Sequence, residues 1–135
     1  MEELQRDHAE AELWATRKEF AFKRAMMIEG LEALGIKVPK EKPLGTFYVW
    51  ASLENLPGKI SHAEFFFQEC LKKKVITVPG HFFDVHPFRV RKTIEPYRHW
   101  VRFSYGPDRE TVKTALERMA QVIKENSQCS CCAVK

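Results

Sequence analysis

A long segment near the N-terminus, from about Leu4 to Leu34, most constrains how this chain can fold. It contains no proline, and its apolar side chains recur at intervals of seven with two further members beside them: Leu13, Phe20, Met27 and Leu34, joined by Ile28 and Leu31. This spacing predicts a single amphipathic helix. Gly35 follows it directly, as is typical of a helix C-terminus, and Pro39 lies just beyond. The first dozen residues are much more polar, so we expect only the C-terminal half of the helix to enter a core.

Composition then sets the class of protein. The chain has 135 residues, the length of one ordinary domain, and 44% of them are apolar, which is enough for a packed core. A net charge of +4 is far from the dense basic coverage of a nucleic-acid binder. No apolar run approaches the roughly 20 residues that cross a bilayer. The N-terminus is charged where a signal peptide would be apolar, so we expect a cytoplasmic chain with free thiols and with neither nucleic acid nor membrane as a partner.

Five further elements are predicted after the long helix. Aromatic and β-branched residues indicate a strand buried on both faces over Thr46–Trp50, a short strand over Val75–Val78, and an alternating strand over His99–Tyr105. A helix starts at a capping box, Ser61-His62-Ala63-Glu64, and ends at Lys72-Lys73-Lys74. The last helix runs from an Asp108 cap to about Lys124.

This order of elements predicts an α+β fold, in which a long N-terminal helix is followed by a small sheet of at least three strands covered by helices. We divide the chain into the long helix (residues 1–36), the α+β domain (37–126) and a flexible, cysteine-rich tail (127–135). Cys70, alone in an apolar run, is expected to be a small buried hydrophobe.

Arg102 is the most informative polar residue. It lies mid-strand beside Trp100, Val101 and Phe103, where burying a guanidinium without an anionic partner would be costly. The residues alone leave two explanations open. Either Arg102 pairs with an internal glutamate or lies on an exposed sheet face, or it binds the carboxylate or phosphate of a ligand.

Three other groups of residues give weaker indications of a functional site. The histidines His81, His86 and His99 follow no known metal-ligand spacing, so we expect loop or surface histidines and no metal. The basic run Arg89–Lys92 is expected to be a solvated loop, because no nucleic-acid fold signature surrounds it. The thiols of Cys129–Cys132 could bind a soft metal or be acylated, but we favour an unstructured, oxidisable tail.

Several motifs together resemble the C-terminal, smaller domain of class I/II aminotransferases, the fold-type I pyridoxal-phosphate enzymes. They lie over roughly residues 18 to 126 and comprise Phe22-Lys23-Arg24 with Gly30-Leu31, then Pro43-Leu44-Gly45-Thr46-Phe47-Tyr48-Val49-Trp50, then Val78-Pro79-Gly80 with Phe83, and finally Val101-Arg102-Phe103-Ser104-Tyr105-Gly106. Each piece is weak by itself, whereas the joint order and spacing are specific.

The resemblance implies that Arg102 binds the α-carboxylate of an amino-acid or 2-oxo-acid substrate, and that Pro79, Gly80 and Phe83 lie at the mouth of the active site. It also implies pyridoxal 5'-phosphate as the cofactor of the complete enzyme, together with a large domain and a homodimer partner. None of the thirteen lysines lies in the family's Ser-x-x-Lys context, so we expect no Schiff-base lysine, no phosphate cup and no specific cofactor binding in this chain.

Two functions therefore remain open. The chain is either the C-terminal portion of an aminotransferase, inactive by itself, or a non-catalytic module that stands alone and binds partners or small carboxylates through Arg102. A small domain without its larger neighbour should expose an apolar patch, for which Trp14 and Phe65-Phe66-Phe67 are the candidates.

Overall fold

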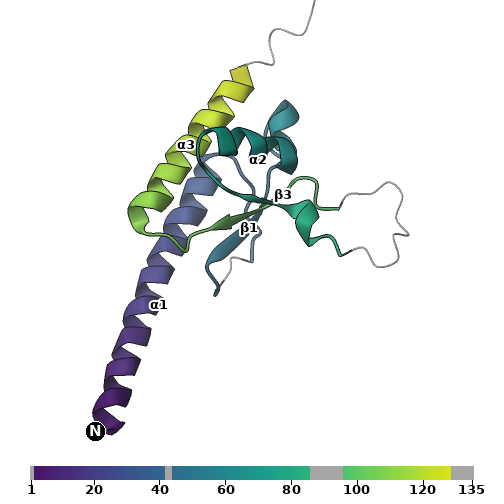
Figure 1. Ribbon diagram of the computed structural model, residues 1–135. Coiled ribbons are helices and arrows are strands. Elements are labelled where there is room, and N and C mark those ends of the chain that lie inside the picture. The colour runs from purple at the N-terminus through teal and green to yellow at the C-terminus, as the bar shows by residue number, and fades with distance from the viewer. Residues whose placement is uncertain (1, 42–43, 86–95, 129–135) are drawn as a thin grey trace, which may run out of the picture.

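Three helices cover one face of a small antiparallel sheet in the computed structural model (Figure 1), which describes residues 2–41, 44–85 and 96–128. This arrangement confirms the predicted α+β fold. The elements in chain order are α1 (Glu2–Ala33), β1 (Tyr48–Ser52), the short helix η1 (Gly58–Ser61), α2 (Ala63–Lys72), β2 (Val78–Pro79), the short helix η2 (Gly80–Phe83), β3 (Trp100–Ser104) and α3 (Arg109–Gln128).

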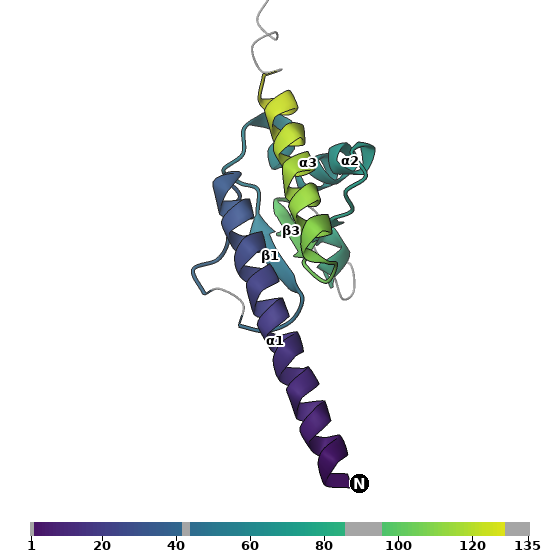
Figure 2. The same ribbon diagram turned by 90° about the vertical axis from the view of Figure 1, so that its left-hand side faces the viewer.

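The helix α1 projects beyond the rest of the molecule at its N-terminal end, as two perpendicular views show (Figures 1 and 2). Residues 6–18 are exposed, whereas Met27, Ile28 and Leu31 are buried. Only the C-terminal half of the predicted stripe therefore enters the core, and Leu13 remains 58% exposed. The helix ends at Ala33, one residue before the predicted end, and the predicted C-terminal glycine, Gly35, has a φ of 80°, which suits a residue without a Cβ atom.

The sheet has the order β1-β3-β2, with β3 in the centre and both pairings antiparallel. Its side chains alternate between two faces, as strand geometry requires. One face is formed by buried residues that pack against the helices, namely Val49, Ala51, Val101 and Phe103. The other carries half-buried residues, among them Tyr48, Trp50 and Arg102. The prediction that the first strand is buried on both faces was therefore wrong.

The strand predicted over Val75–Val78 is shifted, because β2 contains only Val78 and Pro79. The preceding residues still complete the end of α2. The Val75 amide donates to the carbonyl oxygen of Cys70 at 2.9 Å, and Lys74 has a positive φ of 60°. Because of this turn at the end of the helix, the strand begins at Val78, three residues later than predicted.

The predicted capping box of α2 is not formed. Its N-cap is His62, without a side-chain cap, while the Ser61 hydroxyl donates to the carbonyl oxygen of Gly58 at 2.8 Å. The Ser61 hydroxyl, which was predicted to cap α2, thus forms a hydrogen bond within the short helix η1. Phe66 is fully buried and its ring contacts that of Phe103. The prediction of an exposed apolar patch at Phe65-Phe66-Phe67 was therefore wrong for Phe66.

The helix α3 begins as predicted, because the Asp108 carboxylate accepts a hydrogen bond from the Thr111 amide at 2.8 Å. It extends to Gln128, past the expected end, while the rest of the cysteine-rich tail lies outside the described residues.

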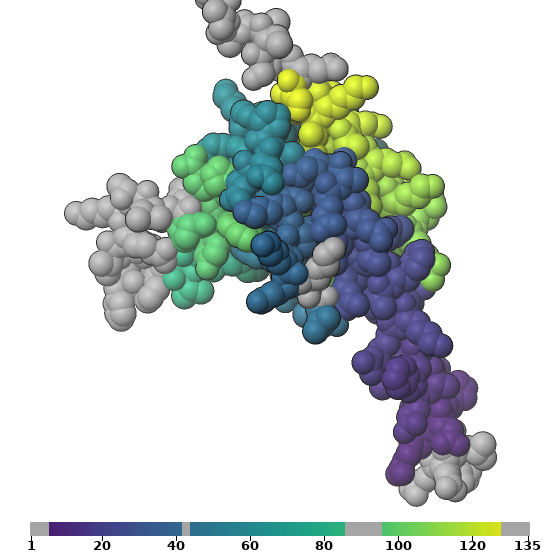
Figure 3. Space-filling model, turned by 180° about the vertical axis from the view of Figure 1, so that it is seen from behind, coloured from purple at the N-terminus to yellow at the C-terminus, as the bar shows by residue number. Residues whose placement is uncertain are grey.

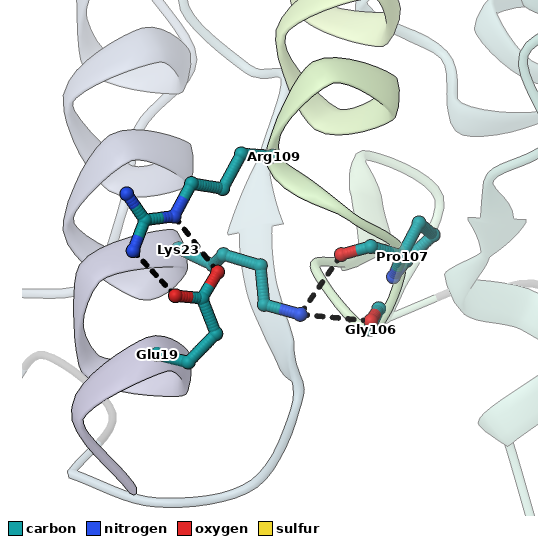
Figure 4. A network of polar contacts seen from close by, with 5 residues as sticks. All are labelled: Glu19, Lys23, Gly106, Pro107 and Arg109. Carbon is teal, nitrogen blue, oxygen red and sulfur yellow. Dashed lines mark hydrogen bonds and ion pairs between the residues drawn. The ribbon is translucent and has the colours of Figure 1, made fainter. Parts of the chain in front are cut away.

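Polar contacts fix the start of α3 against α1 (Figure 4). Lys23, which is buried, donates from Nζ to the carbonyl oxygens of Gly106 at 2.9 Å and Pro107 at 2.8 Å. Arg109 forms two hydrogen bonds to the Glu19 carboxylate. The chain that leaves β3 is therefore held at a defined place along the long helix.

Candidate functional site

Arg102 lies at the centre of the sheet, on the face opposite to the helices. Its register places it beside Trp50 of β1 on one side and Val78 of β2 on the other. The alternation of β3 buries Val101 and Phe103 in the core and turns Arg102 to the opposite face. Because β3 is the central strand and pairs with a strand on each side, the backbone of Arg102 is held in place.

An open cavity of about 270 Å³ surrounds the guanidinium and is lined by Tyr48, Trp50, Phe83, Tyr97 and Arg102. The guanidinium carbon lies 5.2 Å from the ring centre of Tyr48 and 4.9 Å from that of Phe83. These are cation–π distances, so the two rings stabilise the cation and hold its orientation.

No carboxylate of the described residues pairs with Arg102, and within that part of the chain the guanidinium makes no hydrogen bond. The internal salt bridge, one of the two explanations that the sequence left open, is therefore not formed there. The aromatic walls also distinguish this place from an ordinary solvated sheet face. An oxyanion of a ligand would meet unused donors in a partly dry site.

The ring of Trp50 contacts three other aromatic rings, two of which line the cavity. Its ring centre lies 5.3 Å from that of Phe83 and 5.7 Å from that of Tyr97, both edge-on, and it stacks on Trp100 at 5.8 Å with an interplanar angle of 12°. Such ring pairs restrict one another's rotamers and contribute about 0.5–1.5 kcal/mol each. Sequence reasoning missed Tyr48, Trp50 and Tyr97 as lining residues. Trp50 could have been found from the alternation of the strand, because side chains two residues apart lie on the same face and Trp50 therefore shares the face of Tyr48.

The three residues predicted at the mouth of the site fall into two groups. Phe83 lines the cavity, whereas Pro79 and Gly80 are buried beneath it. Pro79 pairs with Val101, and η2 starts at Gly80 and ends at Phe83. A Cβ atom on Gly80 would lie 2.6 Å from the carbonyl oxygen of Tyr97 and 2.8 Å from that of Trp100. This close approach requires glycine, and it brings Phe83 to the guanidinium.

The histidines make separate local contacts. His99 Nδ1 donates to the carbonyl oxygen of Ser61 at 2.7 Å, and His81 lies 3.6 Å from the Glu64 carboxylate. Across the described ranges, no group of three or more His, Cys, Asp or Glu residues is arranged to hold a metal ion. His86, the run Arg89–Lys92 and the cysteine tail lie outside those ranges.

Cys70 is fully buried, as the sequence predicted, and burial raises the pKa of its thiol to about 12. At neutral pH the reactive thiolate is therefore scarce. None of the helices in the described part is long and apolar enough to cross a membrane.

Comparison with known proteins decides the family. A sequence profile described as "Aminotransferase class I and II" matches residues 2–119. The chain belongs to this aminotransferase family. The resemblance noted from the sequence motifs is thereby confirmed.

Relatives of the aminotransferase chain agree in sequence and fold. It is 32% identical over 108 residues to the aspartate/prephenate aminotransferase of Thermus thermophilus, covering 79% of this chain and 23% of that protein. It is 28% identical over 109 residues to the aromatic-amino-acid aminotransferase 2 of Thermococcus litoralis, covering 81% and 24%. The crystal structure of an aromatic aminotransferase from Pyrococcus horikoshii superimposes with a TM-score of 0.69 and 27% identity, covering 89% of this chain and 28% of that one. The chain thus spans about a quarter of the length of these curated relatives.

Complete aminotransferases of this family use pyridoxal phosphate, bound to a lysine as a Schiff base. The described residues do not fit that role. No lysine of the described ranges lines the Arg102 cavity, and Lys23, which is buried, donates from Nζ to two carbonyl oxygens. This part of the chain therefore offers no Schiff-base lysine at that cavity.

Proposed function

We propose that this chain supplies the carboxylate-binding part of the substrate site of a pyridoxal-phosphate aminotransferase. Arg102 binds the α-carboxylate of an amino acid or a 2-oxo acid. The observation that carries the proposal is a guanidinium without a carboxylate partner among the described residues, in an open cavity lined by aromatic rings.

The geometry suits that task. The planar guanidinium offers five N–H donors, and two of them match the two oxygens of a carboxylate. Each charged hydrogen bond of this kind contributes about 1.5–3 kcal/mol. The rings of Tyr48 and Phe83 displace water beside the cation, which strengthens the attraction by lowering the local dielectric. Arg102 would thus bind and orient the substrate without taking part in a covalent step.

The complete site requires further parts. In this proposal a large domain and a homodimer partner supply the Schiff-base lysine and the phosphate cup. The exposed segment of α1, residues 6–18, is the connection to the large domain, and residues 37–126 form the small domain. Leu13 and Trp14, which are 58% and 57% exposed, would be covered there.

The direct test is a titration of the purified chain with 2-oxoglutarate, followed by the arginine Nε–H signals in ¹⁵N NMR spectra. We expect the Arg102 signal to shift saturably, and the Arg102→Gln variant to bind at least about tenfold more weakly. Arg118→Gln, a substitution on α3 outside the Arg102 cavity, is the matched control. Equal affinity in the Arg102→Gln variant would refute the assignment.

A second experiment concerns the cofactor. The chain is mixed with pyridoxal phosphate, reduced with borohydride and mapped by peptide mass. Scattered, substoichiometric labelling is the expected result and supports the need for a large domain. Stoichiometric modification of one lysine would show a cofactor site within this chain and would contradict that need.

A further inference from the structure

A second cavity lies on the helix side of the sheet, away from Arg102. Its volume is about 380 Å³, within the range of small-molecule sites. It opens between α1 and the segment that precedes β1, and Figure 3 views the molecule from the side on which these two parts lie against each other. Its lining residues are Thr16, Arg17, Phe20, Ala21, Arg24, Leu44, Gly45, Thr46 and Tyr105.

The cavity is positively charged. Arg17 and Arg24 lie seven residues apart, two turns along the same side of α1, which separates their Cα atoms by about 10 Å. Between them Ala21 is small and leaves the space between the two side chains open. Among the described residues, none that lines the cavity is acidic.

Both guanidinium groups keep donors for a ligand. Arg24 donates from Nη1 to the carbonyl oxygen of Leu44 at 2.7 Å, and no carboxylate of the described residues pairs with it. The Arg17 guanidinium stacks on Trp14, 4.9 Å from the ring centre, and makes no hydrogen bond or ion pair within the described ranges. Arg109 differs, because Glu19 occupies its guanidinium.

Hydrogen bonds partly offset the repulsion that the carbonyl oxygens of the opposite wall exert on an anion. The buried Tyr105 hydroxyl shares its single proton between the carbonyl oxygens of Thr46, at 2.9 Å, and Gly45, at 3.3 Å. The carbonyl oxygen of Leu44 accepts from Arg24. Thr16 adds a hydroxyl to the lining, and Phe20 and Tyr105 add aromatic surface.

We propose that this cavity binds a small organic anion through a phosphate or carboxylate group held by Arg17 and Arg24. Guanidinium groups recognise both kinds of oxyanion by paired hydrogen bonds. The site is separate from Arg102 and does not depend on the proposed substrate role, because no described residue lines both cavities.

The test titrates the full chain with inorganic phosphate and, in a second arm, with succinate. Ionic strength is held constant with sodium chloride, and Nε–H signals of arginine and the backbone amide of Gly45 are followed by ¹⁵N NMR. We expect saturable shifts of Arg17, Arg24 and Gly45, and the tighter arm identifies the preferred oxyanion. Arg17→Gln, an exposed substitution that breaks no hydrogen bond of the described structure, should weaken binding several-fold.

Three further variants make the result decisive. Arg24→Lys keeps the charge but loses the planar fork, so affinity should fall while the spectrum stays that of a folded protein. Arg118→Gln and Arg102→Gln, both outside this cavity, should leave these shifts unchanged. The proposal is overturned if the shifts do not saturate, if sodium chloride alone reproduces them, or if Arg17→Gln and Arg24→Lys bind as tightly as the unmodified chain.

Discussion

Replacing Gly80 by alanine tests how the fold places a ring beside Arg102. The added Cβ atom would lie 2.6 and 2.8 Å from two backbone oxygens, those of Tyr97 and Trp100, and 2.8 Å from the Tyr97 Cβ atom. Real Cβ atoms do not approach so closely, and backbone cannot rotate away as the end of a side chain can. The start of η2 must therefore move, and Phe83 moves with it.

The magnitude follows from two opposing effects. Overpacking of a well-packed site costs about 1–3 kcal/mol, and the upper half of that range applies where backbone atoms clash. Alanine also restricts the unfolded chain, which offsets about 0.4–1 kcal/mol. We expect Gly80→Ala to lower the free energy of unfolding by about 1–2.5 kcal/mol, which corresponds to about 3–10 °C in the melting temperature.

The assay is urea unfolding followed by tryptophan fluorescence, with Gly45→Ala as the matched control. A Cβ atom on Gly45 meets no atom within 4 Å, so the control should stay within about 0.5 kcal/mol of the unmodified chain. Gly80→Ala should also weaken 2-oxoglutarate binding, since Phe83 leaves its position over the guanidinium. Unchanged stability and unchanged binding in Gly80→Ala would refute the reasoning.

Three further predictions rest on separate contacts. Lys23→Met should destabilise the chain by about 1–3 kcal/mol in urea unfolding, because it removes two charged hydrogen bonds to Gly106 and Pro107; a variant as stable as the parent would contradict this. Hydrogen bonds from Thr111 hold the pKa of Asp108 below its ordinary value of 3.8, so the stabilisation is fully present above that value and is lost as the pH falls through the lower folded pKa. The urea midpoint should accordingly fall less on acidification in Asp108→Ala than in the parent chain, and parallel curves would argue against the cap. Cys70, whose pKa is raised to about 12, should resist iodoacetamide at about pH 8 in the folded chain and react once urea unfolds it, as mass mapping of the Cys70 peptide would show; labelling of Cys70 itself in the folded protein would contradict its burial.

Local sequence patterns predicted the elements best where one chemical signal had no competitor. Gly35 ends α1 and Asp108 caps α3 as expected, because a positive φ and a free first-turn amide each favour few residue types. The capping box at Ser61 failed because Ser61 ends η1, where its hydroxyl donates to the carbonyl oxygen of Gly58, and α2 begins one residue later than predicted, with His62 at its N-cap. Such competition depends on a short helix that the sequence did not indicate.

The sequence by itself determined that Arg102 stands in a strand with one apolar face, and its motifs identified the family. Period-two alternation and local order are encoded by neighbours along the chain, so they can be read without a structure. Only the tertiary structure decided what surrounds the guanidinium. Trp50 and Phe83 come from distant segments, whereas Tyr97 lies in the turn just before β3, and the three meet there through strand register and the close approach at Gly80. The same holds for the cavity at Arg17 and Arg24, whose second wall lies some twenty residues further along the chain and is joined to α1 by a hydrogen bond from Arg24.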